Sequence, residues 1–138
     1  MNTILLVEDD QRLASQWQIS LETKNYRVIH EYSADGAIEA LSETNVDVVV
    51  VDIVLDTAVE AMSLVGGLAV ISYVALNVSP RPAIIAVSGN PATSTFVDHT
   101  LRKIEGLTTL RKPINDMDML AAIEALLQPS SHPQIRLC

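Results

Sequence analysis

Short runs of apolar residues alternate along the chain with longer segments in which apolar residues recur at helical spacing. Five runs rich in Val, Ile and Leu predict β-strands, at residues 4–7, 26–29, 46–51, 83–87 and 107–110. The third run holds Val48 to Val51 without a break. An unbroken β-branched run of this kind is typical of a strand that is buried on both faces of a parallel sheet.

The segments between and after these runs have the length and the end signals of helices. Capping residues, helical spacing and terminal glycines predict helices at residues 10–23, 33–43, 67–77 and 93–103, and a last helix that Asn115 caps after Pro113. Strands that alternate with helices in this way form parallel sheets through right-handed crossovers. We therefore expect an α/β fold, a flavodoxin-like (βα)5 doubly wound parallel sheet with strand order 2-1-3-4-5.

Length and composition indicate one folded domain. The chain has 138 residues, of which 49% are hydrophobic and 19% charged, a balance that rules out intrinsic disorder for the body of the chain. We expect residues 1–127 to form the domain. Residues 128–138 hold two prolines and two serines and are expected to form a flexible C-terminal tail.

Charge and cysteine content narrow the class of protein further. The net charge of −8 repels phosphate backbones, so we expect no binding to nucleic acid. The single cysteine, Cys138, excludes an internal disulfide, and together with the lack of a secretory signal it favours a cytoplasmic location. Residues 61–80 carry no charge and have about the length of a membrane span. We nevertheless expect no membrane span. The stretch contains glycines, serines and an asparagine, and strands are predicted on both sides of it.

Polar residues follow four of the five predicted strands. They are Glu8 and Asp9 after the first strand, Asp52 after the third, Ser88 after the fourth and Lys112 after the fifth. The second strand contributes nothing comparable, and the three histidines are scattered. Each polar residue alone has an ordinary explanation as a cap, a turn or a solvated charge. Together they favour a site, because the carboxyl ends of the strands form the functional edge of such sheets.

The residue types at this edge indicate phosphoryl chemistry. Three converging carboxylates raise one another's pKa values unless a cation lies among them. Because only oxygen donors are offered, Mg²⁺ is the expected ion. A carboxylate beside Mg²⁺ can attack a phosphoryl group and form an acyl phosphate, whose oxygens the Lys112 ammonium and the Ser88 hydroxyl would contact. Asp52 is the predicted nucleophile because it follows the central strand.

Four segments of the sequence resemble the receiver domain of two-component response regulators. They are ILLVEDD at residues 4–10, VVVVDIVL at 48–55, IIAVSG at 84–89 and LRKPI at 110–114. The segments occur in the family's order with near-family spacing, and the resemblance covers nearly the whole chain, residues 2–127. It implies that Asp52 is the phosphoacceptor and that Ser88 and Lys112 contact the phosphoryl group.

The resemblance also implies a metal site and a backbone feature. Mg²⁺ would be bound by Asp9 and Asp52 directly, by Glu8 through water and by the backbone carbonyl of Val54. The peptide bond between Lys112 and Pro113 would be cis.

Three departures from the family pattern are visible. The aromatic switch residue that usually precedes the lysine by three positions is Thr109 here, so a coupled aromatic switch cannot operate in the usual way. Asp56 stands where the family commonly has proline, and we interpret it as a solvated loop residue or as extra charge beside the metal. The link from Asp52 to the third helix is about six residues longer than usual, if Gly66 and Gly67 mark the start of that helix.

The helix predicted at residues 67–77 is unusually apolar. Leu68, Ile71 and Ala75 have the spacing of a face that packs on the sheet. Three further apolar residues fall partly or wholly outside that face: Val70, Tyr73 and Leu76. Either a loop covers them, or they form an interaction surface for a partner or for a homodimer.

The leading hypothesis is a stand-alone response regulator, similar to the chemotaxis regulators. It would accept a phosphoryl group on Asp52 from a histidine kinase or a histidine phosphotransfer protein and signal by altered binding to a downstream protein. It would not be an enzyme, since an aspartate-nucleophile phosphatase needs a second carboxylate at the position of Val54. A flavin site is disfavoured because the acidic residues after the first strand repel phosphate. The alternative is a receiver-like adaptor whose binding does not depend on phosphorylation, which Thr109 and the altered third helix favour.

Overall fold

The computed structural model of the protein describes residues 1–53, 60–89, 104 and 106–128 of the chain. In chain order the elements are β1 (Thr3–Val7), α1 (Gln11–Thr23), β2 (Arg27–Glu31), α2 (Ala34–Glu43), β3 (Val48–Asp52), α3 (Glu60–Asn77), β4 (Ala83–Ser88), β5 (Leu107–Arg111) and α5 (Asp116–Leu127). The helix predicted at residues 93–103 and the tail from residue 129 onward lie outside the described residues.

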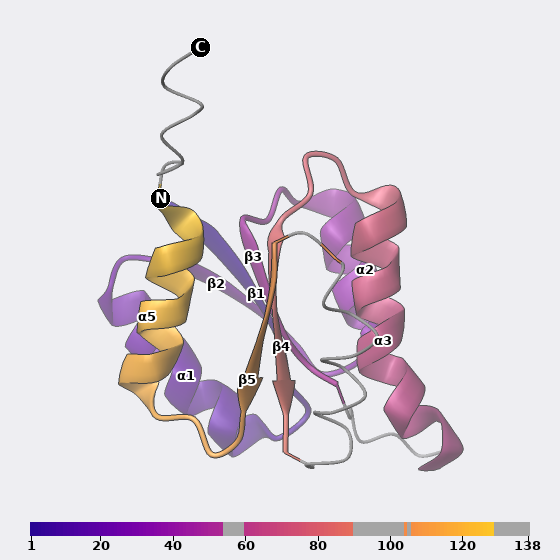
Figure 1. The fold of residues 1–138 in the computed structure, drawn as a ribbon, viewed down its shortest axis with the longest axis horizontal. Helices are drawn as coiled ribbons and strands as arrows, with labels where there is room; N and C mark the ends of the chain where they lie inside the picture. The colour runs from indigo at the N-terminus through magenta and orange to yellow at the C-terminus, as the bar shows by residue number, and fades with distance from the viewer. Residues whose placement is uncertain (54–59, 90–103, 105, 129–138) are drawn as a thin grey trace.

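All five strands are parallel and form one sheet in the order β2-β1-β3-β4-β5. Helices α1 and α5 cover one face of the sheet, and α2 and α3 cover the other (Figure 1). The predicted fold class and strand order are therefore confirmed. The sheet brings the carboxyl ends of β1, β3 and β4 side by side, since these three strands are neighbours at its centre.

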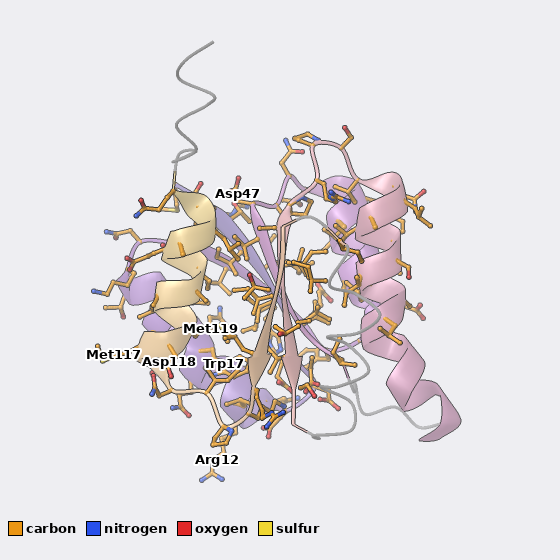
Figure 2. All side chains as sticks on the ribbon, viewed as in Figure 1. Arg12, Trp17, Asp47, Met117, Asp118 and Met119 are labelled. Carbon is orange, nitrogen blue, oxygen red and sulfur yellow. The ribbon has the colours of Figure 1, made fainter. Side chains whose placement is uncertain are left out.

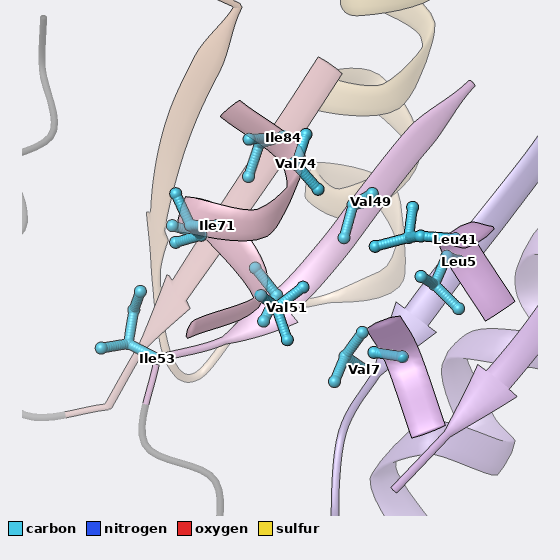
Figure 3. Packing of buried hydrophobic residues seen from close by; sticks show 12 residues of the cluster. Leu5, Val7, Leu41, Val49, Val51, Ile53, Ile71, Val74 and Ile84 are labelled. Carbon is cyan, nitrogen blue, oxygen red and sulfur yellow. The ribbon is translucent and has the colours of Figure 1, made fainter. Parts of the chain in front are cut away.

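The core consists of two apolar clusters, one on each face of the sheet. Because side chains alternate along a strand, Val49 and Val51 of β3 pack under α2 and α3, whereas Val48 and Val50 pack under α1 and α5. Figure 3 shows the first cluster, in which Ile71 and Val74 of α3 lie over β3 and β4. All five residues of β3 are buried, as the unbroken valine run predicts.

Side chains cap α1, α2 and α5, and the caps of α2 and α5 are the predicted ones. Asp10 accepts hydrogen bonds from the backbone N–H groups of Arg12 and Leu13, and Ser33 and Asn115 accept in the same way at the starts of α2 and α5. Helices α1 and α5 lie on the same face of the sheet. Figure 2 shows Trp17 of α1 on the inner side of these two helices, where it is buried, and Met117 of α5 pointing away from them, where it is exposed. The caps fix the helix starts just after the strand ends, where the polar residues lie.

Helix α3 differs from the prediction in its start and in its inner face. It begins at Glu60 and runs for 18 residues, so the residues expected in a longer link belong to the helix instead. Val70 is fully buried together with Val74, and the prediction that Val70 belongs to an exposed interaction surface is therefore wrong. Tyr73 is half-buried against the same cluster, whereas Leu76 is 82% exposed, as expected.

The charge-free stretch at residues 61–80 forms most of α3, and its residues Val70, Ile71 and Val74 pack in the core cluster on one face of the sheet. In the part of the chain that the structure describes, no helix combines the length and the apolar character that crossing a membrane requires.

Candidate functional site

The predicted polar residues meet at the carboxyl edge of the sheet. Glu8 directly follows β1, while Asp52 and Ser88 are the last residues of β3 and β4. Lys112 follows β5, and its backbone N–H donates to the Ser88 carbonyl oxygen at 2.8 Å. This bond continues the pairing of β4 with β5 by one residue and directs Lys112 toward the centre of the sheet.

Lys112 joins two buried carboxylates of the site. Its Nζ atom donates a hydrogen bond to Asp52 Oδ2 at 2.7 Å and lies 3.2 Å from Glu8 Oε1. Glu8 is fully buried and Asp52 is 6% exposed, so both carboxylates lie in an environment with little water to screen their charge. The lysine thus supplies the positive charge that this pair of acids requires.

Glu8, Asp9 and Asp52 form an acidic cluster that could hold a metal ion. One carboxylate oxygen of each lies within 4.8 Å of the other two. The Oε1 atom of Glu8 is buried and has no hydrogen-bond partner among the described residues, despite its proximity to Lys112. Carboxylate oxygens are the donors that Mg²⁺ prefers, so the cluster fits this ion. Bound there, Mg²⁺ would neutralise carboxylate charge and coordinate a phosphoryl oxygen.

Burial and charge shift the pKa values of two groups in the site. Burial, followed by repulsion from Asp52, raises the pKa of Glu8 from 4.5 to about 7, although the Asp10 N–H and Lys112 oppose the shift. Burial lowers the pKa of Lys112, but its hydrogen bond with Asp52 and its attraction to Asp52 and Glu8 outweigh burial, and the net pKa is raised. Lys112 is therefore charged at neutral pH, whereas Glu8 is partly protonated in the metal-free protein.

The edge strand β2 also contributes to the site, which the sequence analysis missed. His30 Nε2 lies 2.8 Å from the backbone carbonyl oxygen of Glu8. The expectation that this strand adds nothing is therefore wrong. The contact depends on the register of β1 with β2, which places His30 beside Leu6, two residues before Glu8.

The remaining predicted site residues are placed as follows. Ser88 is 3% exposed at the end of β4, and Thr109 is exposed on β5 beside Ala86. Val54 and Asp56 lie outside the described residues. The peptide bond between Lys112 and Pro113 is cis, as expected. Tyr73 and Leu76 lie in the second half of α3 and not at this edge of the sheet.

The structure thus joins a five-stranded doubly wound sheet to an acidic cluster and a lysine at its carboxyl edge. The family model of the response regulator receiver domain matches residues 4–124. The chain belongs to this family, the receiver domains of two-component systems.

Two curated proteins illustrate the relationship. The chain is 27% identical to the regulatory protein VanR of Enterococcus faecium, over 91% of this chain and 49% of that protein. It is 29% identical to the response regulator ArlR of Staphylococcus saprophyticus, over 93% of this chain and 53% of that protein. The chain thus spans about half the length of the curated relatives it matches.

Solved structures agree with this assignment. The signal receiver domain of a response regulator from Bermanella marisrubri has a TM-score of 0.74 and 26% identity, covering 91% of this chain and 98% of that one. A CheY-like receiver domain from Methanospirillum hungatei has a TM-score of 0.67 and 24% identity, and the match covers 91% of this chain and 94% of that one. At this identity the likeness supports the fold alone.

Proposed function

We propose that Asp52 accepts a phosphoryl group from a phosphohistidine on a histidine kinase or a histidine phosphotransfer protein. The observation that carries the proposal is the 2.7 Å hydrogen bond from Lys112 Nζ to Asp52 Oδ2, next to the acidic cluster. This contact places a cation beside the one carboxylate that ends the central strand. A phosphoryl group attached there would keep the cation within reach of its oxygens.

The transfer requires little from the protein beyond position and charge. An oxygen of the Asp52 carboxylate bonds to phosphorus while the bond from phosphorus to the donor histidine nitrogen breaks, and that nitrogen keeps the electron pair. Lys112 and the Ser88 hydroxyl stabilise the negative charge on the phosphoryl oxygens. Glu8, Asp9 and Asp52, with the backbone carbonyl of Val54 that the family resemblance implies, would hold Mg²⁺.

Phosphorylation would then change the affinity of the domain for a downstream protein, in the cytoplasm and without direct contact to nucleic acid. We propose that the receiver domain signals in this way. The alternative is an adaptor whose binding is independent of phosphorylation. Thr109 supports it, because an exposed threonine occupies the β5 position where the family usually has an aromatic switch residue.

Phosphorylation by a small donor tests the proposal. The protein is incubated with Mg²⁺ and acetyl phosphate, and intact mass is followed for the addition of one phosphoryl group. We expect the wild type and Asp118→Asn, which changes an exposed aspartate of α5, to gain the group, and Asp52→Asn to gain none. A wild type that gains no phosphoryl group, or an Asp52→Asn variant that gains it at the wild-type rate, would refute the proposal.

A further inference from the structure

Gly67 occupies the interior of helix α3, a place where glycine is less favourable than alanine. The reason for a glycine lies in what the helix contacts. A Cβ atom at this position would lie 2.5 Å from Ile53 Cα and 2.6 Å from the Ile53 carbonyl oxygen, and nearer still to the Asp52 carbonyl oxygen. All three are backbone atoms, so no side-chain rearrangement can make room. The helix thus rests directly on the backbone that carries Asp52.

An added methyl group must displace either the helix or the end of the strand. The second half of helix α3 is held by Val70, Ile71 and Val74, each no more than 1% exposed. Strand β3 ends at Asp52, and the next residue is tied to β4 by one hydrogen bond, from Ile53 N–H to the Val87 carbonyl oxygen at 2.9 Å. Figure 3 shows Ile53 at this strand end beside α3. The strand end is the less firmly held of the two and should yield first.

The displacement would reach the acceptor carboxylate. Bringing a Cβ from 2.5 Å to an ordinary contact of 3.4 to 4 Å requires a movement of about 1 Å. Asp52 Oδ2 lies 2.7 Å from Lys112 Nζ, and its carboxylate shares the acidic cluster with Glu8 and Asp9. A shift of that size separates these groups, and misplacement by about 1 Å can slow a positioned reaction about a hundredfold.

We propose that Gly67 is a positioning residue for phosphoryl transfer: the absence of a side chain lets α3 hold the Asp52–Ile53 backbone in the place that the site requires. The inference rests on the proposed function of Asp52. Gly67 lies on α3 and Asp52 ends β3, so a residue of one element sets the rate of phosphoryl transfer to a residue of another.

Gly36 of helix α2 provides a matched control. It lies in the first turn of α2, where its N–H donates to the N-cap Ser33, and a Cβ there would meet chiefly the carboxylate end of the Glu31 side chain, which is flexible and can move aside. Both Gly36→Ala and Gly67→Ala replace a helical glycine with the better helix former alanine. The difference between the two variants isolates the contact with the β3 backbone.

The experiment compares phosphorylation rates by acetyl phosphate at saturating Mg²⁺, at a temperature where circular dichroism shows each variant folded. We expect Gly67→Ala to react at least about tenfold more slowly than the wild type and Gly36→Ala. Amide exchange at Ile53 should also be faster in Gly67→Ala alone, because the bond to Val87 is disturbed. Equal rates for both glycine variants would overturn the inference and leave the proposed function intact. A wild type that is not phosphorylated would overturn the proposed function itself.

A third variant separates positioning from loss of stability. Val70→Ala removes a buried contact of the same helix without pressing on β3, so we expect a less stable protein with an unchanged phosphorylation rate. A rate as slow as that of Gly67→Ala would refute a specific role for Gly67. Where Gly67→Ala is unfolded in buffer, the comparison is made in trimethylamine N-oxide, which favours the compact state. A variant that stays unfolded there would overturn the inference, since a local displacement leaves a folded domain.

Discussion

His30 Nε2 lies 2.8 Å from the backbone carbonyl oxygen of Glu8 and so links the edge strand β2 to the acidic cluster. A carbonyl oxygen only accepts hydrogen bonds, which means that Nε2 carries the hydrogen in this contact. The His30 ring also meets the Tyr32 ring edge to face, with ring centroids 4.4 Å apart. The imidazole therefore holds the backbone of Glu8 from outside the cluster, in the manner of groups that orient metal ligands.

The first prediction concerns this contact. His30→Phe keeps a ring beside Tyr32 but loses the donor, and we expect it to weaken Mg²⁺ binding by about tenfold. Tyr32→Leu is the matched control, since it removes the ring contact and keeps the hydrogen bond. Isothermal titration calorimetry with Mg²⁺ measures both variants. Wild-type affinity in His30→Phe would show that the bond does not orient Glu8.

A second prediction follows from the competition between Lys112 and a metal ion. The Lys112 ammonium pairs with Asp52 and Glu8, two of the three carboxylates in the cluster. Lys112→Met removes this charge, and we expect Mg²⁺ to bind roughly tenfold more tightly at a pH where all three carboxylates are ionised. The same variant should be phosphorylated more slowly, because the cation beside the phosphoryl oxygens is lost. Lys24→Met, at an exposed lysine after α1, should match the wild type in both assays. Unchanged or weaker Mg²⁺ binding in Lys112→Met would contradict the prediction.

The pH dependence of stability reports on Glu8. Its pKa is raised in the folded protein to about 7 from 4.5, so the folded state binds more protons than the unfolded state between these values. The associated stability is complete below pH 4.5 and is lost as the pH rises through 7. Since one pKa unit corresponds to about 1.4 kcal/mol, the loss amounts to up to about 3 kcal/mol.

Urea unfolding in EDTA, at pH values on both sides of this range, measures the effect. We expect the wild type to lose stability as the pH rises and Glu8→Gln, which cannot ionise, to lose much less. Added Mg²⁺ should stabilise the wild type at the higher pH, where Glu8 is ionised. Identical pH slopes for the two proteins would show that Glu8 does not titrate in this range.

The sequence predicted the site better than it predicted the helix beside it. Glu8, Asp52 and Lys112 could be placed together because parallel strands bring their carboxyl ends to one edge of the sheet, and the alternation of five strands with helices fits the flavodoxin-like strand order. His30 was missed because a contact from its side chain to the backbone of a neighbouring strand depends on register, which hydrophobic pattern alone does not supply.

The start of α3 was missed for a different reason. The sequence pattern predicts that Gly66 and Gly67 mark the start of the helix, but the helix begins at Glu60 and Gly67 lies in its interior, where the close approach to the Ile53 backbone leaves no space for a side chain. Tertiary contact thus outweighs local propensity. The inner face of the helix carries Val70 and Val74 rather than the predicted Ala75.

Leu76 is the residue of the predicted interaction surface on α3 that can be tested by substitution, because it is exposed. Leu76 is 82% exposed, so Leu76→Glu should shift a homodimer to monomer without loss of stability. Tyr73→Glu would not separate loss of dimerisation from loss of stability, because Tyr73 packs against the core cluster and its replacement also destabilises the fold. Light scattering over a range of concentrations measures the association. A wild type that is monomeric at the highest concentration would contradict the prediction of a homodimer.

Ser20 and Asp116 join helix α1 to the start of α5, and the last prediction concerns this pair. Ser20 Oγ donates to Asp116 Oδ2 at 2.5 Å, while Asp116 Oδ1 is buried without a hydrogen-bond partner among the described residues. Ser20→Ala leaves the carboxylate without this donor, and we expect a loss of about 1 to 3 kcal/mol in urea unfolding. Ser72→Ala, at an exposed serine of α3, should stay within about 0.5 kcal/mol of the wild type. In an Asp116→Ala background, where no acceptor remains, Ser20→Ala should lower the free energy of unfolding much less. An equal cost in both backgrounds would show that the effect of Ser20 does not act through Asp116.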